Sequence, residues 1–523
     1  MNNILLIINI TAVLLFAFAK IKYELQMLQQ NSYRNERYIK WFRKNYKKSI
    51  RIPEVVLFLL ITGSFYVNLY TTFILGIVGY SGLAYFLLTK KHKLKFVFTQ
   101  RARRLFFTAT AILLVFNLTA ILLMTIFPHQ VLFISFSIIM SFAIVLMTNF
   151  LLKPVEARIN RWYLNDAKKT LASMPDLTVI GITGSYGKTS TKHFLHRILS
   201  EKYNVLMTPG SYNTTMGVVR TVREYLKPTH QIFIAEMGAK QAGDIKEICE
   251  IVNPTIGILT SVAEQHLDTF KTIENVRKTK FELIDSLPQN GLAILNADYD
   301  IIKNQKVANT KTCYYSTENK DAQYKIEKIS YTKTGSKFTV IRNEKSTELE
   351  TSLVGSYNLS NILASVAVAE YLEVPEIKIS FAVKKLEPVK HRLEIKRNKS
   401  GVTIIDDAFN SNPKGAKMAL EVLQNIEGIR KIIITPGMIE LADKHDYYNQ
   451  KFGEQIAEVC DYAVLVGKKI TQPILKGLKN KNYPDKNIYI AENLADAMKH
   501  INSIVKQGDV LLYENDLPDT YEY

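Results

Sequence analysis

Apolar and polar residues divide the chain into two regions with different patterns. After residue 153, short apolar runs alternate with stretches of helical periodicity. Before it lie four long apolar runs, which cover residues 4–19, 55–88, 105–127 and 131–152, and basic segments separate the first three of them. About 20 apolar residues cross a bilayer as a helix, whereas short apolar runs bounded by turn residues are typical of buried strands. We therefore predict an α-helical membrane region followed by an α/β region.

The apolar runs predict about five transmembrane helices within residues 1–153. The run 55–88 is about twice one span, so we expect a hairpin of two helices there. Residues 105–127 and 131–152 predict a second hairpin. No basic residue precedes the run 4–19, and Lys20 follows it. This favours an uncleaved anchor over a signal peptide. Buried helices of a soluble domain are the alternative.

The distribution of charge predicts the orientation of these helices. The net charge is +19, and much of it lies in two short segments. Residues 20–51 carry ten Lys/Arg and two Glu, and residues 89–104 carry seven Lys/Arg and no acid. Basic loops remain in the cytoplasm, beside anionic membrane lipids. We predict a multi-pass protein with its N-terminus outside and everything after Lys153 in the cytoplasm. The α/β region carries little excess charge, so nucleic-acid binding is not predicted.

The cysteines indicate a reducing compartment. Cys249, Cys313 and Cys460 are scattered, with no disulfide framework and no metal-binding spacing.

The second region alternates between strand and helix patterns, which indicates parallel α/β sheets. Residues 154–176 predict a short polar linker, and residues 310–354 predict a β-hairpin insertion. The predicted strands are Leu177–Ile182, Gln231–Glu236, Ile256–Thr260, Leu292–Leu295, Val402–Asp406 and Lys431–Thr435. The predicted helices include Thr189–Leu199, Ile245–Ile251, Ile273–Asp285 and Lys414–Gln424.

A glycine-rich stretch from Val179 to Lys192 predicts a phosphate-binding loop. A strand leads into glycines at 181, 184 and 187, and a helix follows. Backbone N–H groups and the helix N-terminus would cradle an anion there. Lys188 would reach the outer phosphates, and the Thr189 hydroxyl would hold Mg²⁺. The spacing departs from the common loop because Ile182, not glycine, stands six residues before Lys188.

Four polar residues follow this loop at the ends of predicted strands or on a helix: Glu236, His266, Lys280 and Asn296. A carboxylate at a strand end could hold Mg²⁺, and a neutral imidazole could ligate a divalent ion. Taken singly, each has a structural alternative, since strand-end acids often belong to turns and a lone histidine is often structural.

Taken together, the motifs resemble the Mur ligase family, and within it the MurF branch, which joins D-Ala-D-Ala to a UDP-muramoyl tripeptide. The resemblance covers about residues 175–515. Its motifs, in order, are Thr183–Ser190, Glu236, His266-Leu267-Asp268, Lys280, Leu295–Asp298, Gly355–Asn361, Asp406–Pro413 and Gly437–Leu441.

The resemblance implies an ATP-dependent amide ligase with a phosphate-loop, parallel-sheet ATPase domain at 177–388 and a Rossmann-like α/β domain at 389–523. A carboxylate would attack the γ-phosphate of ATP to give an acyl phosphate, and an amine would then displace phosphate. Lys188, Lys280 and His266 would be catalytic. ATP would be bound by Gly184, Ser185, Gly187, Lys188, Thr189, Ser190, Asn296, Arg392 and Asp407. Two Mg²⁺ ions would be held by Thr189, Glu236, His266 and Lys280, the last as a carbamate.

Three features depart from the family pattern. Tyr357 stands where the family has histidine. The C-terminal stretch Tyr513–Asp519 is acidic where MurF enzymes carry Lys-Gly-Ser-Arg. Predicted membrane helices occupy the place of the domain that binds the UDP-sugar.

We therefore predict a membrane-bound ligase that joins an amino acid or dipeptide to a cell-envelope precursor. The acceptor could be UDP-linked, or lipid-linked or polymeric as in poly-γ-glutamate synthases. A non-catalytic membrane scaffold and a transporter ATPase are alternatives from other classes. The sequence leaves the acceptor, the amino donor and the oligomeric state open.

Overall fold

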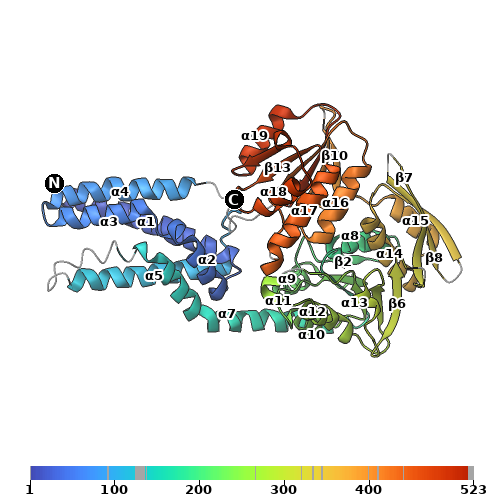
Figure 1. Cartoon of the computed structure of the whole chain (residues 1–523). Helices are drawn as coiled ribbons and strands as arrows, with labels where there is room; N and C mark the ends of the chain where they lie inside the picture. The colour runs from blue at the N-terminus through green and yellow to red at the C-terminus, as the bar shows by residue number, and fades with distance from the viewer. Residues whose placement is uncertain are drawn as a thin grey trace. The chain divides into compact units, whose positions relative to one another are not determined.

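The chain forms two compact units, Met1–Arg161 and Trp162–Asp516. The first is helical, and the second contains two sheets flanked by helices (Figure 1). This agrees with the predicted order of a helical region before an α/β region. The computed structural model describes residues 2–90, 94–123, 136, 138–264, 267–319, 321–332, 335–342, 345–398, 400–408, 411–439 and 441–515.

The helices of the first unit follow the apolar runs, with two corrections. The basic segment 20–51, predicted as a loop, is mostly helical, because lysine and arginine are good helix formers and α2 buries Tyr38 and Trp41. The predicted linker is not a separate helix, because α7 continues through Pro154 without a break. The helices are α1 (Asn2–Gln30), α2 (Asn35–Ser49), α3 (Ile52–Phe65), α4 (Leu69–Thr89), α5 (Gln100–Leu123) and α7 (Ser141–Ala172).

Buried polar groups join α1, α2 and α3. Lys20 Nζ lies 2.5 Å from Glu54 Oε2, and each of the two side chains is only 1% exposed. Glu24 accepts hydrogen bonds from Tyr38 Oη, at 2.8 Å, and from Ser49 Oγ. Because a buried charge is costly without partners, these contacts favour one packing arrangement of the three helices.

Two described helices, Tyr70–Thr89 and Gln100–Thr119, are long and apolar enough to cross a membrane. The apolar helix Ile52–Phe65 is shorter. The predicted hairpin over 55–88 is present as α3 and α4. Residues 124–135 of the second predicted hairpin lie outside the described residues. The five-span arrangement therefore stays a prediction.

The first sheet of the second unit has nine strands in the order β2-β3-β1-β4-β5-β6-β7-β8-β9. The strands from β2 to β7 pair in parallel. Its elements are β1 (Thr178–Thr183), α8 (Lys188–Leu199), β2 (Val205–Met207), α9 (Thr215–Tyr225), β3 (Ile232–Glu236), α10 (Asp244–Val252), β4 (Ile256–Leu259), α11 (Leu267–Phe270), α12 (Ile273–Asp285), β5 (Leu292–Asn296), α13 (Asp300–Lys303), β6 (Lys311–Ser316), β7 (Tyr324–Thr332), β8 (Gly335–Arg342), β9 (Lys345–Thr351), α14 (Ser356–Tyr371) and α15 (Glu376–Lys384).

The predicted insertion over 310–354 is not a single hairpin. β6 pairs with β5 in parallel and continues the main sheet. β7, β8 and β9 then form an antiparallel extension of its edge. Residue alternation predicts that a segment is a strand, but it does not specify which strand is its neighbour.

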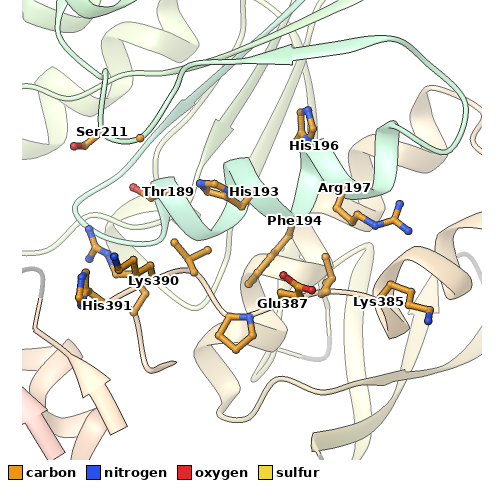
Figure 2. Close-up of a pocket in the computed structure, with 15 residues that line it drawn as sticks. Thr189, His193, Phe194, His196, Arg197, Ser211, Lys385, Glu387, Lys390 and His391 are labelled. Atoms are coloured by element: carbon orange, nitrogen blue, oxygen red, sulfur yellow. The ribbon is translucent and has the colours of Figure 1, made fainter. Parts of the chain in front are cut away.

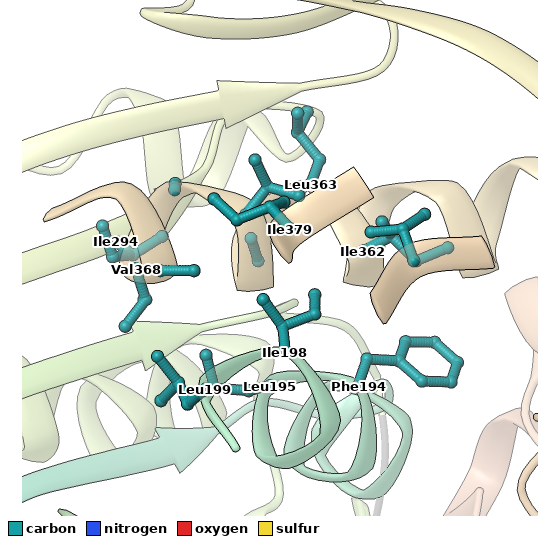
Figure 3. Close-up of a cluster of buried hydrophobic side chains, with 14 of the residues drawn as sticks. Phe194, Leu195, Ile198, Leu199, Ile294, Ile362, Leu363, Val368 and Ile379 are labelled. Atoms are coloured by element: carbon teal, nitrogen blue, oxygen red, sulfur yellow. The ribbon is translucent and has the colours of Figure 1, made fainter. Parts of the chain in front are cut away.

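Apolar side chains cover both faces of this sheet. On one face, Ile180, Ile234 and Ile294 pack against α8, α14 and α15 (Figure 3). The other face packs against α9, α10 and α12 through Phe233, Leu283 and their neighbours. Each buried Leu, Ile or Phe contributes about 1.5–3 kcal/mol. These two cores hold the carboxyl ends of the central strands in place.

The second sheet has six strands in the order β10-β11-β15-β12-β13-β14. All its pairs are parallel except β10–β11. Its elements are β10 (Glu394–Arg397), β11 (Thr403–Asp407), α16 (Pro413–Asn425), β12 (Lys431–Thr435), η2 (Ala442–Lys444), α17 (His445–Val459), β13 (Tyr462–Val466), α18 (Gln472–Asn480), η3 (Asp485–Asn487), β14 (Ile488–Ala491), α19 (Leu494–Ile504) and β15 (Val510–Glu514).

Candidate active site

The predicted phosphate loop joins β1 to α8. Gly184 and Gly187 have φ of 155° and 88°, a backbone region that favours glycine. A Cβ at Gly184 would lie 2.0 Å from Thr260 Oγ1. Ser261, after β4, holds the loop through its carbonyl, which accepts from Ser185 N–H at 2.9 Å. The loop is therefore shaped by a neighbouring strand as well as by its own glycines.

Lys188, the first residue of α8, lies over this loop. Its Nζ donates to the carbonyl of Gly184 at 2.6 Å. Desolvation lowers the pKa of Lys188 to about 8, with Glu236 opposing and Arg392 adding to the shift. The ammonium group therefore stands at the loop mouth and interacts with charges from both sheets.

Glu236, at the end of β3, is the most densely bonded acid near the loop. Thr189 Oγ1 lies 3.1 Å from its Oε2, Lys192 Nζ lies 3.0 Å from the same atom, and Asn213 Nδ2 donates to Oε1 at 3.0 Å. Burial alone would raise the pKa of Glu236, but Lys192, Lys188 and Asn213 together lower it. The group is therefore held as a carboxylate.

Lys192 and Asn213 were not predicted from the sequence. Lys192 is fully buried on α8, where it binds Glu236 and donates to the carbonyl of Gly210 at 2.5 Å. It follows Lys188 by four residues, so helical spacing places both on one face. That spacing could have identified Lys192. No periodic signal marks Asn213, which lies in a loop.

The Thr189 hydroxyl and the Glu236 carboxylate fit the predicted Mg²⁺. They lie close together at the loop mouth, and oxygen atoms are the ligands that Mg²⁺ prefers. A second cluster of side chains that could hold a metal ion consists of His391, Glu394 and Asp406. Their possible ligand atoms lie within 4.8 Å of one another. Lys396 already pairs with both carboxylates of this cluster, at 2.8 and 3.1 Å, which favours an ion-pair cluster there.

Lys280 lies on α12 and is 2% exposed. Burial lowers the pKa of Lys280 well below its usual range, and the charge of Lys188 lowers it further, while Glu282 and Asp244 oppose the shift. The surroundings of Lys280 therefore disfavour the charged form of its amine. His266, the other predicted ligand of the second metal, lies outside the described residues.

Asn296, predicted to contact adenine, is buried at the end of β5. Its Nδ2 donates to the carbonyl of Thr260 at 2.9 Å, and its Oδ1 accepts from Asp298 N–H at 3.0 Å. These contacts join the ends of β4 and β5. The side chain thus has a structural role alongside the predicted one.

Three tyrosine rings gather at the glycine-rich loop, and the sequence did not predict them as a group. The ring of Tyr186 lies 6.0 Å from those of both Tyr299 and Tyr357. The hydroxyl of Tyr357, at the position where the family has histidine, lies 3.1 Å from where a Cβ on Gly187 would stand. The tyrosine tip therefore reaches the phosphate loop.

Arg392 and Asp407 belong to the second sheet and its linker. They line a small cavity together with Tyr186, Ser190 and Tyr357. The structure thus brings both predicted residues to the phosphate loop. Asp407 Oδ1 accepts from the N–H of Leu393 at 3.2 Å.

A buried acid, Glu514, is paired with Asp407 across β11 and β15. Glu514 Oε1 accepts from Ser411 Oγ at 2.5 Å, and Oε2 has no hydrogen-bond donor among the described residues. Burial raises the pKa of Asp407 to about 6 against the opposing charge of Arg392. Burial and Asp407 raise the pKa of Glu514 well above its usual range. Two adjacent carboxyl groups therefore share a low-polarity site.

We expect Glu514→Gln to stabilise the protein at pH 8. A carboxyl group whose pKa is higher in the folded than in the unfolded protein stabilises the fold fully below its unfolded pKa, which is about 4. This stabilisation is lost as the pH rises through the folded pKa, which for Asp407 is about 6. For the partly exposed Asp407 this loss is about 2 kcal/mol. Burial and Asp407 raise the pKa of Glu514 itself, so replacing it by an uncharged glutamine removes this group's own loss of stability and should raise the thermal midpoint at pH 8 relative to pH 5.

The control for this experiment is Glu458→Gln, an exposed glutamate on α17. It should leave the pH dependence of the midpoint unchanged. If Glu514→Gln lowers the midpoint equally at pH 5 and pH 8, the two carboxyl groups do not repel each other.

Models of two known domain families match the second unit. The Mur ligase middle domain matches residues 182–369, and the Mur ligase, glutamate ligase domain matches residues 391–513. Together they cover both sheets of the unit.

Two similar proteins, which share one name, each match a little under two thirds of this chain. The UDP-N-acetylmuramoyl-tripeptide–D-alanyl-D-alanine ligase of Bacillus subtilis (strain 168) is 27% identical over 337 residues, which is 64% of this chain and 72% of the relative. That of Buchnera aphidicola subsp. Baizongia pistaciae is 30% identical over 347 residues, or 63% of this chain and 75% of the relative.

Solved structures share the fold. The crystal structure of MurF ligase from Thermotoga maritima in complex with ADP has a TM-score of 0.62 and 25% sequence identity, and the match covers 68% of this chain and 80% of that one. A pseudomurein peptide ligase type C from Methanothermus fervidus matches with a TM-score of 0.53 at 18% identity.

Proposed function

Because the chain belongs to the Mur ligase family of ATP-dependent amide-bond ligases, we propose that it extends the peptide of a peptidoglycan precursor at the cytoplasmic face of a membrane. Mur ligases use ATP and Mg²⁺, and their catalytic domains are cytoplasmic. The observation that carries the proposal is the Glu236 cluster. In it, a carboxylate, a hydroxyl and two lysine side chains lie close together at one glycine-rich loop, and this combination supports binding of Mg²⁺ and phosphate.

The reaction we propose begins with attack of an acceptor carboxylate oxygen on the γ-phosphorus of ATP, with departure of ADP. The amine donor then attacks the acyl carbon, phosphate leaves, and the donor nitrogen loses a proton. Both early reactants are anionic, so positive charge must bring them together. Lys188 supplies such a charge at the loop mouth, and Arg392 supplies another from the linker before β10.

Thr189 and Glu236 would hold Mg²⁺ beside the phosphates of ATP. Bound there, the ion would neutralise phosphate charge and polarise the γ-phosphoryl group. Lys192 and Asn213 would keep Glu236 ionised and oriented toward Thr189. A carbamate on Lys280, together with His266, would form the second metal site. The lowered pKa of Lys280 supports this proposal, because an amine reacts with CO₂ only when unprotonated.

Nucleotide recognition is assigned to Asn296, Arg392 and Asp407, beside the loop residues Gly184 to Ser190. The described contacts that support this assignment are the cavity shared by Arg392, Asp407 and Ser190 and the adjacent tyrosines.

The acceptor is the finer part of the proposal. The named relatives act on a UDP-linked tripeptide, and neither family match reaches the first 181 residues. Two helices in that part could cross a membrane. We propose that the multi-span N-terminal unit holds the ligase beside an acceptor that is itself membrane-bound. A UDP-linked acceptor is the second candidate, favoured by the similarity to the named relatives.

A truncation that starts at Trp162, the first residue of the second unit, tests this assignment. We expect it to turn over ATP at a rate similar to the full chain, because the loop, Glu236 and Lys280 all lie in that unit. On acceptor in native membranes we expect at least a tenfold loss of ligation, since anchoring raises the local acceptor concentration. The measurement is amide product formed per enzyme.

A soluble UDP-linked muramoyl peptide is the control acceptor for this truncation. Equal ligation of it by the full chain and the truncation, with no loss on membranes, would contradict the membrane-bound acceptor and leave the UDP-linked one. If the full chain forms no amide product with either acceptor, the ligase proposal fails and the scaffold alternative returns.

A further inference from the structure

The two sheets of the second unit are joined covalently by the segment 385–392. Figure 2 shows Lys390 and His391 of this segment facing Thr189 and His193 on α8. A cavity of about 660 Å³ lies between the segment and the helix, so the connection is not packed tightly there. Domains joined by one loosely packed segment move relative to each other unless a further interface holds them. Contacts elsewhere between the two sheets are therefore needed to fix the place of the second sheet.

Glu264, in the loop that follows β4, makes such a contact. Its Oε1 accepts a hydrogen bond from Lys444 Nζ at 2.5 Å, and its Oε2 accepts one from Tyr448 Oη at 2.5 Å. Lys444 is the last residue of η2 and Tyr448 lies on α17, so both donors belong to elements of the second sheet. One carboxylate of the first sheet thus binds the second sheet through both of its oxygen atoms.

The loop that carries Glu264 also shapes the phosphate loop. Ser185 Oγ donates to the carbonyl of Ala263 at 2.9 Å and accepts from the N–H of Ala263 at 3.0 Å. Ser261 Oγ accepts from the N–H of Tyr186 at 2.9 Å. The position of Glu264 is therefore fixed relative to the phosphate loop.

Within the second sheet, hydrogen bonds connect α17 to the end of β15. Asn449, next to Tyr448, accepts from the N–H of Met438 at 2.9 Å and donates to its carbonyl at 3.0 Å. Gly437, the preceding residue, accepts through its carbonyl from Asn515 Nδ2 at 2.6 Å. The helix that Glu264 holds is therefore linked to the residue that follows β15.

The same series of bonds continues to residues assigned to the nucleotide. The Asn515 N–H donates to the carbonyl of Asp407 at 3.2 Å, and Asp407 Oδ1 accepts from the N–H of Leu393, which follows Arg392. Arg392 and Asp407 line one small cavity with Ser190, at the start of α8. Hydrogen bonds thus connect Glu264 with the part of the nucleotide site that the second sheet supplies.

We infer that Glu264 is a positioning residue for the nucleotide site. By holding Lys444 and Tyr448, it fixes the second sheet so that Arg392 and Asp407 face the phosphate loop. The inference rests on the proposed function, since it concerns the same ATP site. It adds a residue that belongs to none of the catalytic, ATP-binding or metal-binding sets named above and that acts on the nucleotide through Arg392.

A double-mutant cycle, with ADP binding to the full chain measured by calorimetry, tests this role. We expect Glu264→Ala to weaken ADP binding about tenfold, because Arg392 is no longer held at the site. Arg392→Ala should weaken it at least as much. Adding Glu264→Ala to that variant should cause less than a twofold further loss. Losses that multiply in the double variant would overturn the inference, because Glu264 would then act independently of Arg392.

Charge reversal tests the contact between the sheets. Glu264→Lys and Lys444→Glu should each weaken ADP binding about tenfold, and the two together should restore it to within threefold of the unmodified chain. A general defect in folding would not be restored by a second reversal, so absence of rescue would contradict the inference.

The Tyr448 hydroxyl has a matched control. Tyr448→Phe should weaken ADP binding two- to threefold. Tyr447→Phe removes the hydroxyl of the adjacent tyrosine, which is 62% exposed, and should bind ADP like the unmodified chain. Equal affinities of the two variants would remove Tyr448 from the contact and count against the inference.

Hydrogen exchange separates this inference from the ligase proposal, because it requires no nucleotide. The amides of α17 should exchange faster in Glu264→Ala than in the unmodified chain and unchanged in Tyr447→Phe. If the unmodified chain binds no ADP, the ligase proposal fails whatever the exchange shows. If the chain binds ADP and Glu264→Ala changes neither the exchange nor the affinity, the positioning role fails and the ligase proposal stands.

Discussion

Lys188→Ala is expected to reduce ATP turnover by about three orders of magnitude or more. Its ammonium group is the positive charge nearest to the expected γ-phosphate, since it lies over the carbonyls of Gly184 and Ser185. Removing a preorganised charge of this kind costs transition-state stabilisation that solvent does not replace. The loop should keep its shape, because Gly184, Gly187 and the bonds to Ser261 set it. The measurement is phosphate release by protein purified in detergent.

The control is Lys246→Ala, which removes an exposed lysine from α10. It should keep full activity, and both variants should have the thermal midpoint of the unmodified protein. Retention of more than a few per cent of activity by Lys188→Ala would contradict the assignment of this loop as the phosphate site.

Lys280→Ala is expected to reduce ligation by at least two orders of magnitude. Desolvation and Lys188 disfavour the protonated form of the buried amine, and an unprotonated amine can take up CO₂ to give a carbamate. The new carboxylate would supply an oxygen ligand for the second metal ion. Acetate or formate should fill the space left by the truncated side chain and restore part of the activity, whereas bicarbonate should not.

Lys278→Ala is the matched control, because Lys278 is exposed on the same helix two residues away. A second measurement does not depend on activity. Protein equilibrated with ¹³C-bicarbonate should show a carbamate carbon resonance that Lys280→Ala lacks and Lys278→Ala keeps. A fully active Lys280→Ala variant would show that this lysine is structural, and an unchanged carbamate signal would assign the carbamate to another residue.

The loop could be identified from the sequence because its determinants are contiguous. Strand β1, the glycines at 184 and 187, Lys188 and the start of α8 all lie within a few residues of one another. Hydrophobic periodicity is likewise local, so the strands and helices whose bounds were predicted lie within about two residues of the observed elements, and α12 was predicted with its observed bounds.

Local pattern was less reliable where a segment's environment decides its conformation. The basic residues 20–51 were predicted as a loop because of their charge, yet α1 and α2 bury Glu24, Tyr38 and Trp41 among one another. The insertion after β6 was predicted as one hairpin, but β6 pairs with β5 and the three following strands extend the sheet edge. In each case the partner surface, which is remote in sequence, determined the outcome.

By itself the sequence determined the order of the helical and α/β regions, the glycine-rich loop after β1 and the family motifs, since all of these depend on residues near one another in the chain. Only the tertiary structure decided which side chains meet. The parallel register of β11 and β15 places Glu514 beside Asp407, and the burial of α8 brings Lys192 to Glu236. The order of strands in a sheet is set by packing between distant segments, and their spacing along the chain does not encode it.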